Sequence, residues 1–190
     1  MSEARLRLYA ALVEKWSPKI NLISKSDLPH IWERHIQDSL HLLPYIPANT
    51  TRAIDLGSGA GFPGLVLCIA TGIPFDLIES DSRKAVFLME AARQTGAPAK
   101  IHNTRIETAR VKPAPLITAR ALAPLDKLLA LASPHLAPGG ICLFPKGRAA
   151  GDELTLAAPL WHMEAERITD PAWGDSCILK VSQIRHAGPE

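Results

Sequence analysis

Three glycines at alternate positions, Gly57, Gly59 and Gly61, have the spacing that points most directly to chemistry. They follow an apolar stretch at 53–56, typical of a buried strand, and precede a stretch at 63–70 that is typical of a helix. Because glycine has no Cβ atom, such a loop can turn sharply and bring its backbone close to a ligand. In this context the sequence predicts a loop that holds a nucleotide-like cofactor.

Two classes of cofactor are compatible with the glycine loop. The three glycines after Asp55 are typical of adenosylmethionine-binding loops, whereas the last two and Gly64 match the dinucleotide fingerprint Gly-x-Gly-x-x-Gly. Glu79 lies about 20 residues further on, where either cofactor places its ribose hydroxyls. We expect adenosylmethionine, contacted by Asp55 and the three glycines, because a carboxylate suits an ammonium group and a sulfonium better than a pyrophosphate.

Motifs that the sequence lacks make some kinds of methylation target less favoured than others. The segment 118–122, after the fourth apolar stretch, lacks the Asn/Asp-Pro-Pro-aromatic motif that usually accompanies methylation of an exocyclic amine. Cys68, Cys142 and Cys177 lie in apolar runs, which is typical of buried thiols in a cytosolic protein and does not favour a cysteine nucleophile for a pyrimidine ring carbon. Guanine N7 carries a free lone pair and can be methylated through positioning alone. No general base is therefore predicted, and the catalytic residue stays unassigned.

Arg120 ends the fourth predicted strand, beside the point where a doubly wound sheet reverses its strand order. A guanidinium group there could hold the carboxylate of the cofactor or an RNA phosphate. The alternative is an internal ion pair with Asp55 or Glu79. We predict contact with the cofactor.

Arg34, His35 and Asp38 lie three and four residues apart on a predicted helix, so Arg34 and His35 could each pair with Asp38. One interpretation is a surface ion pair beside a buried histidine. The other is that this helix caps the crevice and that the three side chains shape a pocket for the target base.

Basic side chains gather in two parts of the chain where they could border the crevice and neutralise RNA phosphates. These candidates are Lys15, Lys19, Lys25, Arg34, Lys146 and Arg148. Acidic residues are interspersed among them, so ordinary solvated surface is the alternative interpretation. The remaining histidines have no ligand spacing, and we expect no metal site.

Seven short apolar stretches predict the strands of one sheet. They span residues 53–56, 75–79, 99–103, 116–119, 141–144, 162–168 and 177–184. Helical patterns at 63–70, 82–95 and 124–133 separate the early stretches, which indicates a parallel sheet covered by helices on both faces. The segment 169–176 is too short for a parallel crossover, so the last two strands should form an antiparallel hairpin. This seven-stranded, mostly parallel α/β pattern is typical of the class I methyltransferase, Rossmann-like fold.

The N-terminal part has a different pattern. Apolar residues at 6–16 recur every three or four positions, which predicts an amphipathic helix that ends before Pro18. Asp27 is a candidate N-cap for a second amphipathic helix. We predict a helical cap at 1–46 packed on a core at 47–190, in one structural domain.

Length and composition limit the possible number of domains and the possible class of protein. The chain has 190 residues, 47% of them hydrophobic, which excludes a disordered chain and favours a single domain. The longest apolar run, 65–70, is far shorter than the roughly 20 residues of a membrane span, and the charged N-terminus does not resemble a signal peptide. We therefore expect a cytoplasmic protein. The net charge of +2 neither requires nor excludes a nucleic-acid partner.

Several motifs together resemble one family. They are Lys15-Trp16, Asn21-Leu22, Glu33 to Leu40, Asp55 to Gly64, Glu79-Ser80, Arg83-Lys84, Phe87-Leu88, Arg105-Ile106-Glu107, Ala119-Arg120-Ala121 and Lys146-Gly147. The Arg-His-x-x-Asp-Ser helix placed before Gly-x-Gly-x-Gly-x-Pro-Gly is much more specific than the glycine loop alone. From about Lys15 to Gly147, the chain resembles the ribosomal RNA small subunit methyltransferase G family, also called glucose-inhibited division protein B.

The resemblance implies transfer of a methyl group from adenosylmethionine to N7 of one guanine in the 530 loop of 16S rRNA. The partner would be 16S rRNA or the small ribosomal subunit, with neither DNA nor a membrane expected. Carried over by position, the cofactor residues are Gly57, Phe62, Ile106, Glu107 and Arg120, with Glu79 at the ribose. Ser17 and Ile23 stand where the family more often has Asn and Thr, which affects the expected RNA-facing surface rather than the cofactor site.

Three alternative functions remain compatible with the sequence alone. A small-molecule methyltransferase could use the N-terminal helices as a lid. A dinucleotide-dependent oxidoreductase would use the alternative glycine fingerprint. A protein that binds adenosylmethionine without catalysis would also match, because no residue is demonstrably catalytic.

Overall fold

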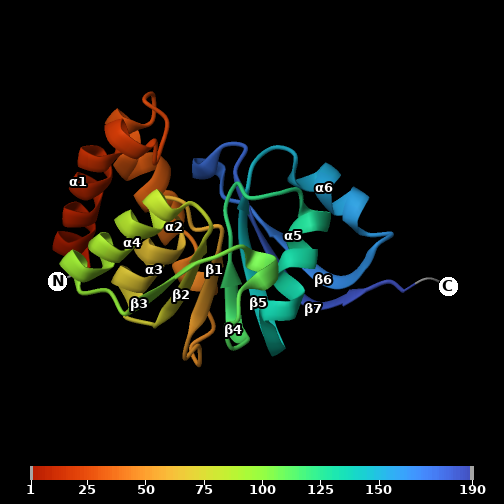
Figure 1. Cartoon of the computed structure of the whole chain (residues 1–190). Helices are drawn as coiled ribbons and strands as arrows, with labels where there is room; N and C mark the ends of the chain where they lie inside the picture. The colour runs from red at the N-terminus through yellow and green to blue at the C-terminus, as the bar shows by residue number, and fades with distance from the viewer. Residues whose placement is uncertain (1, 189–190) are drawn as a thin grey trace.

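The computed structural model describes residues 2–188, which are built around one seven-stranded sheet (Figure 1). The strands are β1 Ala53–Leu56, β2 Phe75–Glu79, β3 Ala99–Asn103, β4 Ala114–Thr118, β5 Leu136–Lys146, β6 Trp161–Ile168 and β7 Cys177–His186. They lie in the order β3-β2-β1-β4-β5-β7-β6. β1 to β5 run parallel, whereas β7 pairs antiparallel with both β5 and β6. The predicted α/β class and the C-terminal antiparallel hairpin are confirmed.

Helices cover both faces of the sheet, because successive residues of a strand point to opposite faces. Ala53 of β1 belongs to the hydrophobic cluster on one face and Ile54 to the cluster on the other. The helices of the first face are α1 Ser2–Ile20, α3 Gly64–Thr71 and α4 Ser82–Thr95, and those of the second are α5 Leu125–Ala132 and α6 Ala150–Ala157. Figure 1 shows the two groups on either side of the strands. No helix within residues 2–188 is both long and apolar enough to cross a membrane.

The first helix extends beyond its predicted end. α1 runs from Ser2 to Ile20 with Pro18 in its last turn. A proline removes only its own N–H donor, and the helix ends where Asn21, in the left-handed region with φ 51°, donates its backbone N–H to the Ser17 carbonyl. The prediction that the helix stops before Pro18 is therefore wrong.

The second helical region is a series of short turns rather than one helix. It consists of the 3₁₀ turns Leu28–His30 and Leu43–Tyr45, the π-helix Trp32–Gln37 and the short helix α2 Asp38–Leu40. Asp27 precedes the first turn, but within the described residues its carboxylate caps no backbone N–H there. It accepts from Ser24 Oγ and Arg34 Nη1 instead, both at 2.7 Å. Asp27 therefore takes the predicted N-cap position, but of a short 3₁₀ turn and without the capping hydrogen bond.

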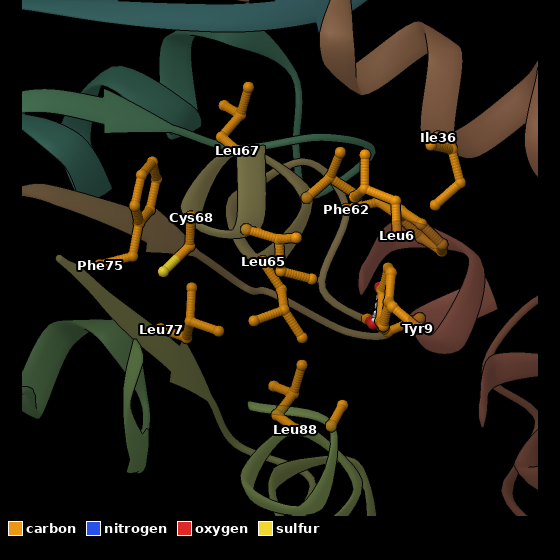
Figure 2. Packing of buried hydrophobic residues seen from close by; sticks show 14 of the residues in the cluster. Leu6, Tyr9, Ile36, Phe62, Leu65, Leu67, Cys68, Phe75, Leu77 and Leu88 are labelled. Carbon is orange, nitrogen blue, oxygen red and sulfur yellow. Dashed lines mark hydrogen bonds between the residues drawn. The ribbon is translucent and has the colours of Figure 1, made fainter. Parts of the chain in front are cut away.

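The N-terminal cap and the sheet bury their apolar side chains together. Leu6 and Tyr9 of α1 belong to the same hydrophobic cluster as Leu65 of α3. Figure 2 shows these side chains converging on the start of α3. The division into a cap at 1–46 and a core at 47–190 stays a prediction, because one continuous cluster joins the two parts.

The structure extends two predicted strands and adds one helix. β5 begins at Leu136 and β4 at Ala114, because the two strands pair across a register shift that accommodates Gly139 at φ 73°. α6 lies in a segment for which the sequence predicts no element, since Gly151 and an exposed surface weaken its helical pattern.

Candidate functional site

A cavity of about 500 Å³, the first cavity, opens over the glycine loop at the carboxyl ends of the strands. Its wall combines the loop, the residues after β2, β3 and β4, and part of the cap. The sequence-predicted residues in this wall are Gly57, Gly59, Phe62, Glu79, Ile106, Glu107, Arg120 and His35. Lining residues that the sequence reasoning missed include Asp27, Ser58, Lys84 and Leu122. Of these four residues, Ser58 and Lys84 could have been found from the sequence, since both belong to family-like motifs.

Gly57 and Gly59 have a backbone geometry that favours glycine. Both lie in the left-handed region, with φ of 62° and 57°, where other residues are strained. A Cβ atom at Gly57 would also fall 2.6 Å from the side chain of Leu122, which lines the same cavity. The loop therefore presents bare backbone to the cavity.

Asp55 lies beneath the loop rather than in the cavity. Its side chain is fully buried, and its Oδ1 accepts a hydrogen bond from Thr118 Oγ1 at 2.6 Å. Burial raises the pKa of Asp55 to about 6. The prediction that it contacts the cofactor does not fit this position, because the strand turns the side chain inward. Gly61 also faces inward, where a Cβ atom would lie 2.8 Å from Tyr9 Oη.

Glu79 ends β2 and connects two loops beside the cavity. Its carboxylate accepts hydrogen bonds from the backbone N–H groups of Gly59 and Asp81, both at 2.7 Å. An ionised carboxylate has about four lone-pair sites, so it can also accept from a ligand hydroxyl. Ile106 and Glu107 line the same cavity from the 3₁₀ turn that follows β3.

Three side chains stack where the cap meets the glycine loop. The rings of His35 and Phe62 have centroids 4.9 Å apart, and the guanidinium of Arg120 lies 5.2 Å from the centre of the Phe62 ring. Arg120 Nη2 donates to His35 Nδ1 at 2.6 Å, and Nη1 donates to the Arg34 carbonyl at 3.2 Å. Because Nδ1 accepts, a neutral His35 carries its proton on Nε2. Burial and the charge of Arg120 lower the pKa of His35 to about 4.

The expected pairing of Arg34 and His35 with Asp38 is wrong. Arg34 Nη1 donates to Asp27 Oδ1 at 2.7 Å, and His35 Nδ1 accepts a hydrogen bond from Arg120. Residues 32–37 form a π-helix, in which side chains four positions apart no longer lie above one another. The carboxylate of Asp38 is left facing a different cavity from His35.

Arg120 lies between two cavities, two residues beyond the end of β4. The internal ion pair with Asp55 or Glu79 that the sequence allowed is absent from the described part of the chain. The guanidinium instead donates hydrogen bonds to two groups of the cap, His35 Nδ1 and the Arg34 carbonyl. The segment 120–122 lines the first cavity and also a second cavity of about 740 Å³. Arg120 can therefore contact a group in either cavity.

The second cavity was not predicted, because segments far apart in the sequence build it. Its lining includes Asp38, His41, Arg120, Leu122, Lys146, Glu153, Leu156, Trp173 and Cys177. No local pattern signals that His41 and Trp173, which stack with ring centroids 4.7 Å apart, come together. Only the fold, which brings the cap and the C-terminal hairpin to the same end of the sheet, reveals this cavity.

The basic candidates for RNA binding differ in exposure. Lys146 is largely buried, and its Nζ donates to Glu153 Oε2 at 2.6 Å and to the Ala123 carbonyl at 2.9 Å. The prediction that Lys146 binds phosphate does not fit this environment. Arg148 is exposed and pairs with Asp175 at 2.6 Å. The exposed basic side chains of the cap include Lys15, Lys19, Lys25 and Arg34.

Two solved structures with the same architecture are methyltransferases. The N-methyltransferase NodS from Bradyrhizobium japonicum, in complex with S-adenosyl-L-homocysteine, matches with a TM-score of 0.61 and 14% identity, covering 92% of this chain and 99% of that one. A TehB-like SAM-dependent methyltransferase from Corynebacterium glutamicum matches with a TM-score of 0.57 and 16% identity, covering 78% and 88%. These matches show the class I methyltransferase fold.

Sequence comparisons identify the family. The family model described as rRNA small subunit methyltransferase G matches residues 2–170. A ribosomal RNA small subunit methyltransferase G from Rhodospirillum centenum is 53% identical over 188 residues, covering 97% of this chain and 85% of that protein. One from Acidiphilium cryptum is 51% identical over 185 residues, covering 96% and 85%. These matches confirm the resemblance, and with it adenosylmethionine as the cofactor: the chain belongs to the ribosomal RNA small subunit methyltransferase G family.

Proposed function

We propose that this protein transfers a methyl group from adenosylmethionine to N7 of a guanine in the 530 loop of 16S rRNA, in the cytoplasm. The observation that carries the proposal is the first cavity, where a bare glycine loop, Glu79 and Arg120 meet at the carboxyl ends of the strands. Family membership supports an rRNA substrate. The choice of guanine, its N7 atom and the 530 loop rests on the family resemblance.

The residues of the first cavity fit the parts of adenosylmethionine. Glu79 could accept hydrogen bonds from the ribose hydroxyls, and Ile106 offers apolar contact to the adenine ring. Gly57 and Gly59 leave room for the methionine part, and Arg120 could hold its carboxylate. When bound, adenosylmethionine supplies an activated methyl group on a sulfonium.

The protein has only to orient and shield the reacting groups. Guanine N7 needs no proton removed, so positioning, worth up to about 7–11 kcal/mol, can carry the reaction. His35 is neutral near pH 7 and fixes the guanidinium of Arg120, while the ring of Phe62 packs against both. No general base is assigned, in keeping with a nucleophile that already carries its lone pair.

Methylation of small ribosomal subunits tests the proposal. Subunits from a strain that lacks the enzyme are incubated with it and with methyl-labelled adenosylmethionine, and the rRNA is then digested and mapped. We expect the label in 7-methylguanosine within the 530 loop. Label in another nucleoside, or no transfer although the cofactor binds, would contradict the proposal. Free 16S rRNA as a parallel substrate shows whether the particle is required.

A further inference from the structure

The second cavity adjoins the first along the segment 120–122, which lines both. Its volume of about 740 Å³ is within the range of small-molecule sites. Its walls come from the cap, the segment after β5, α6 and the connection between β6 and β7. A group held in this cavity would adjoin, along this segment, a cofactor held in the first cavity.

Two aromatic side chains from distant parts of the sequence line the second cavity. The rings of His41 and Trp173 stack with centroids 4.7 Å apart and an interplanar angle of 22°. Leu122 and Leu156 add apolar surface to the same cavity. Enzymes that modify a base take it out of its stack and hold it against aromatic and apolar side chains. A nucleobase could extend the stacked pair on the outer face of one ring, which a flexible aliphatic substrate could not do.

The polar groups of the second cavity favour guanine over the other bases. Asp38 keeps 46% of its side chain exposed and, among residues 2–188, receives no hydrogen bond; His41 Nδ1 lies 4.0 Å from its Oδ1, beyond hydrogen-bond distance. Glu153, in contrast, is paired with Lys146 at 2.6 Å. Guanine is the RNA base that presents two adjacent donors, N1–H and the 2-amino group, beside the acceptor O6. A carboxylate complements the two donors, and one of the N–H groups that Arg120 does not donate to His35 or Arg34 complements O6.

We propose that the second cavity holds the target guanine, with Asp38 accepting hydrogen bonds from N1–H and the 2-amino group while Arg120 donates to O6. This assignment rests on the proposed function. O6 and N7 share one edge of the base, so Arg120 at O6 directs N7 towards the first cavity.

The assignment also accounts for the charge that the reaction creates. The N7 lone pair forms a bond to the methyl carbon as the carbon–sulfur bond breaks, and the electrons of that bond stay on sulfur. The positive charge moves from the sulfonium to the purine, and no proton is released. The carboxylate of Asp38 then faces a cationic ring, which it stabilises.

A double-mutant cycle between the protein and the base tests the assignment. Small subunits are reconstituted with guanosine or with inosine, which lacks the 2-amino group, at the target position, and kcat/KM is measured. We expect the wild type to prefer guanosine about 10-fold or more, and Asp38→Ala to be about 10- to 100-fold slower on guanosine with that preference lost. Asp38→Asn, which keeps the shape of the side chain, should lose the preference too. Glu33→Ala, at an exposed carboxylate of the same helical region, is the control and should keep it.

The outcomes distinguish this inference from the proposed function. If the wild type methylates guanosine but shows no preference over inosine, or if Asp38→Ala keeps the full preference, the inference is overturned and the proposed function stands. If the wild type methylates neither substrate, the proposed function fails and the inference fails with it. Binding of S-adenosylhomocysteine with wild-type affinity shows that Asp38→Ala is folded.

Discussion

At the scale of single residues, one hydroxyl ties the N-terminal helix to the cofactor loop. Tyr9 is fully buried and donates to the carbonyl of Ala60, between the glycines, at 2.5 Å (Figure 2). Tyr9→Phe removes the donor, so we expect about 3- to 10-fold weaker binding of S-adenosylhomocysteine and about 1–2 kcal/mol lower stability, measured by calorimetry and thermal unfolding. Tyr45→Phe, at a half-buried ring of the cap, is the control and should change neither. Unchanged affinity in Tyr9→Phe would show that the loop does not depend on α1.

The sequence predicts the types of site residues better than the directions of their side chains. Gly57 and Glu79 reach the cavity as expected, because a glycine loop between strand and helix places them at the carboxyl ends of neighbouring strands. Asp55 was misplaced because the alternation along β1 turns it under the loop. Lys146 was misplaced because its partner Glu153 lies on α6, a helix that the sequence analysis did not predict.

At the scale of elements, the start of α3 depends on its close approach to β1. A Cβ atom at Gly64 would overlap the carboxyl group of Asp55. We expect Gly64→Ala to lower the melting temperature by several degrees, through overpacking worth about 1–3 kcal/mol. Gly151→Ala is the control: a Cβ atom there meets no described atom within 4 Å, and α6 should gain about 0.5–1 kcal/mol. An undiminished melting temperature for Gly64→Ala would contradict the close approach.

At the scale of one element, the exposed lysines near the end of α1 are expected to contribute to RNA binding. Lys19 and Lys25 line a groove beside the end of α1. If each neutralises one phosphate, its replacement by alanine should reduce the slope of log affinity for small subunits against log salt by about 0.7–0.9. Filter binding over about 50–200 mM salt measures this slope. Lys100→Ala, at an exposed lysine of β3, should leave it unchanged; an equal slope in all variants would remove these phosphate contacts.

Strands were easier to predict than the cap for a physical reason. Buried parallel strands are nearly continuous apolar runs, so β1 and β2 have the predicted bounds. The π-helix Trp32–Gln37 packs Trp32 and Ile36 against the core at the spacing that an α-helix would also use, and the sequence does not separate the two. Its i→i+5 hydrogen bonds widen the turn and change which side chains meet, which is why Arg34 and His35 do not pair with Asp38.

At the scale of the whole molecule, the partly buried His35 and the fully buried Asp55 contribute oppositely to the pH dependence of stability. The pKa of His35 is lowered to about 4, so between about pH 6.5 and 4 the unfolded chain binds a proton that the folded chain does not, and stability is lost as the pH falls. The pKa of Asp55 is raised to about 6, so between about pH 4 and 6 the folded chain keeps a proton that the unfolded chain has released. Stability from this group is lost as the pH rises.

Variants at the two positions separate these contributions. Relative to the wild type, Asp55→Asn should gain in melting temperature as the pH rises from about 4 to 6, because it lacks the group whose contribution is then lost. His35→Gln should lose in melting temperature relative to the wild type over the same range. Differential scanning calorimetry measures both profiles. Parallel profiles for all three proteins would show that neither group titrates as described.

The arrangement of the whole chain explains why the sequence does not predict the second cavity. Figure 1 shows the N-terminal cap and the connection between β6 and β7 at the same end of the sheet. His41 and Trp173 meet there, although most of the chain separates them. Local patterns predict which elements form, but only their packing brings such residues together.

A crystal structure with S-adenosylhomocysteine, the product of methyl transfer, shows directly whether the first cavity holds the cofactor beside the second. We predict the ligand in the first cavity, with its ribose hydroxyls at Glu79 and its sulfur facing the segment 120–122 that adjoins the second cavity. A sulfur that faces away from this segment, a ligand in the second cavity, or a first cavity without ligand at saturating concentration would contradict the claim.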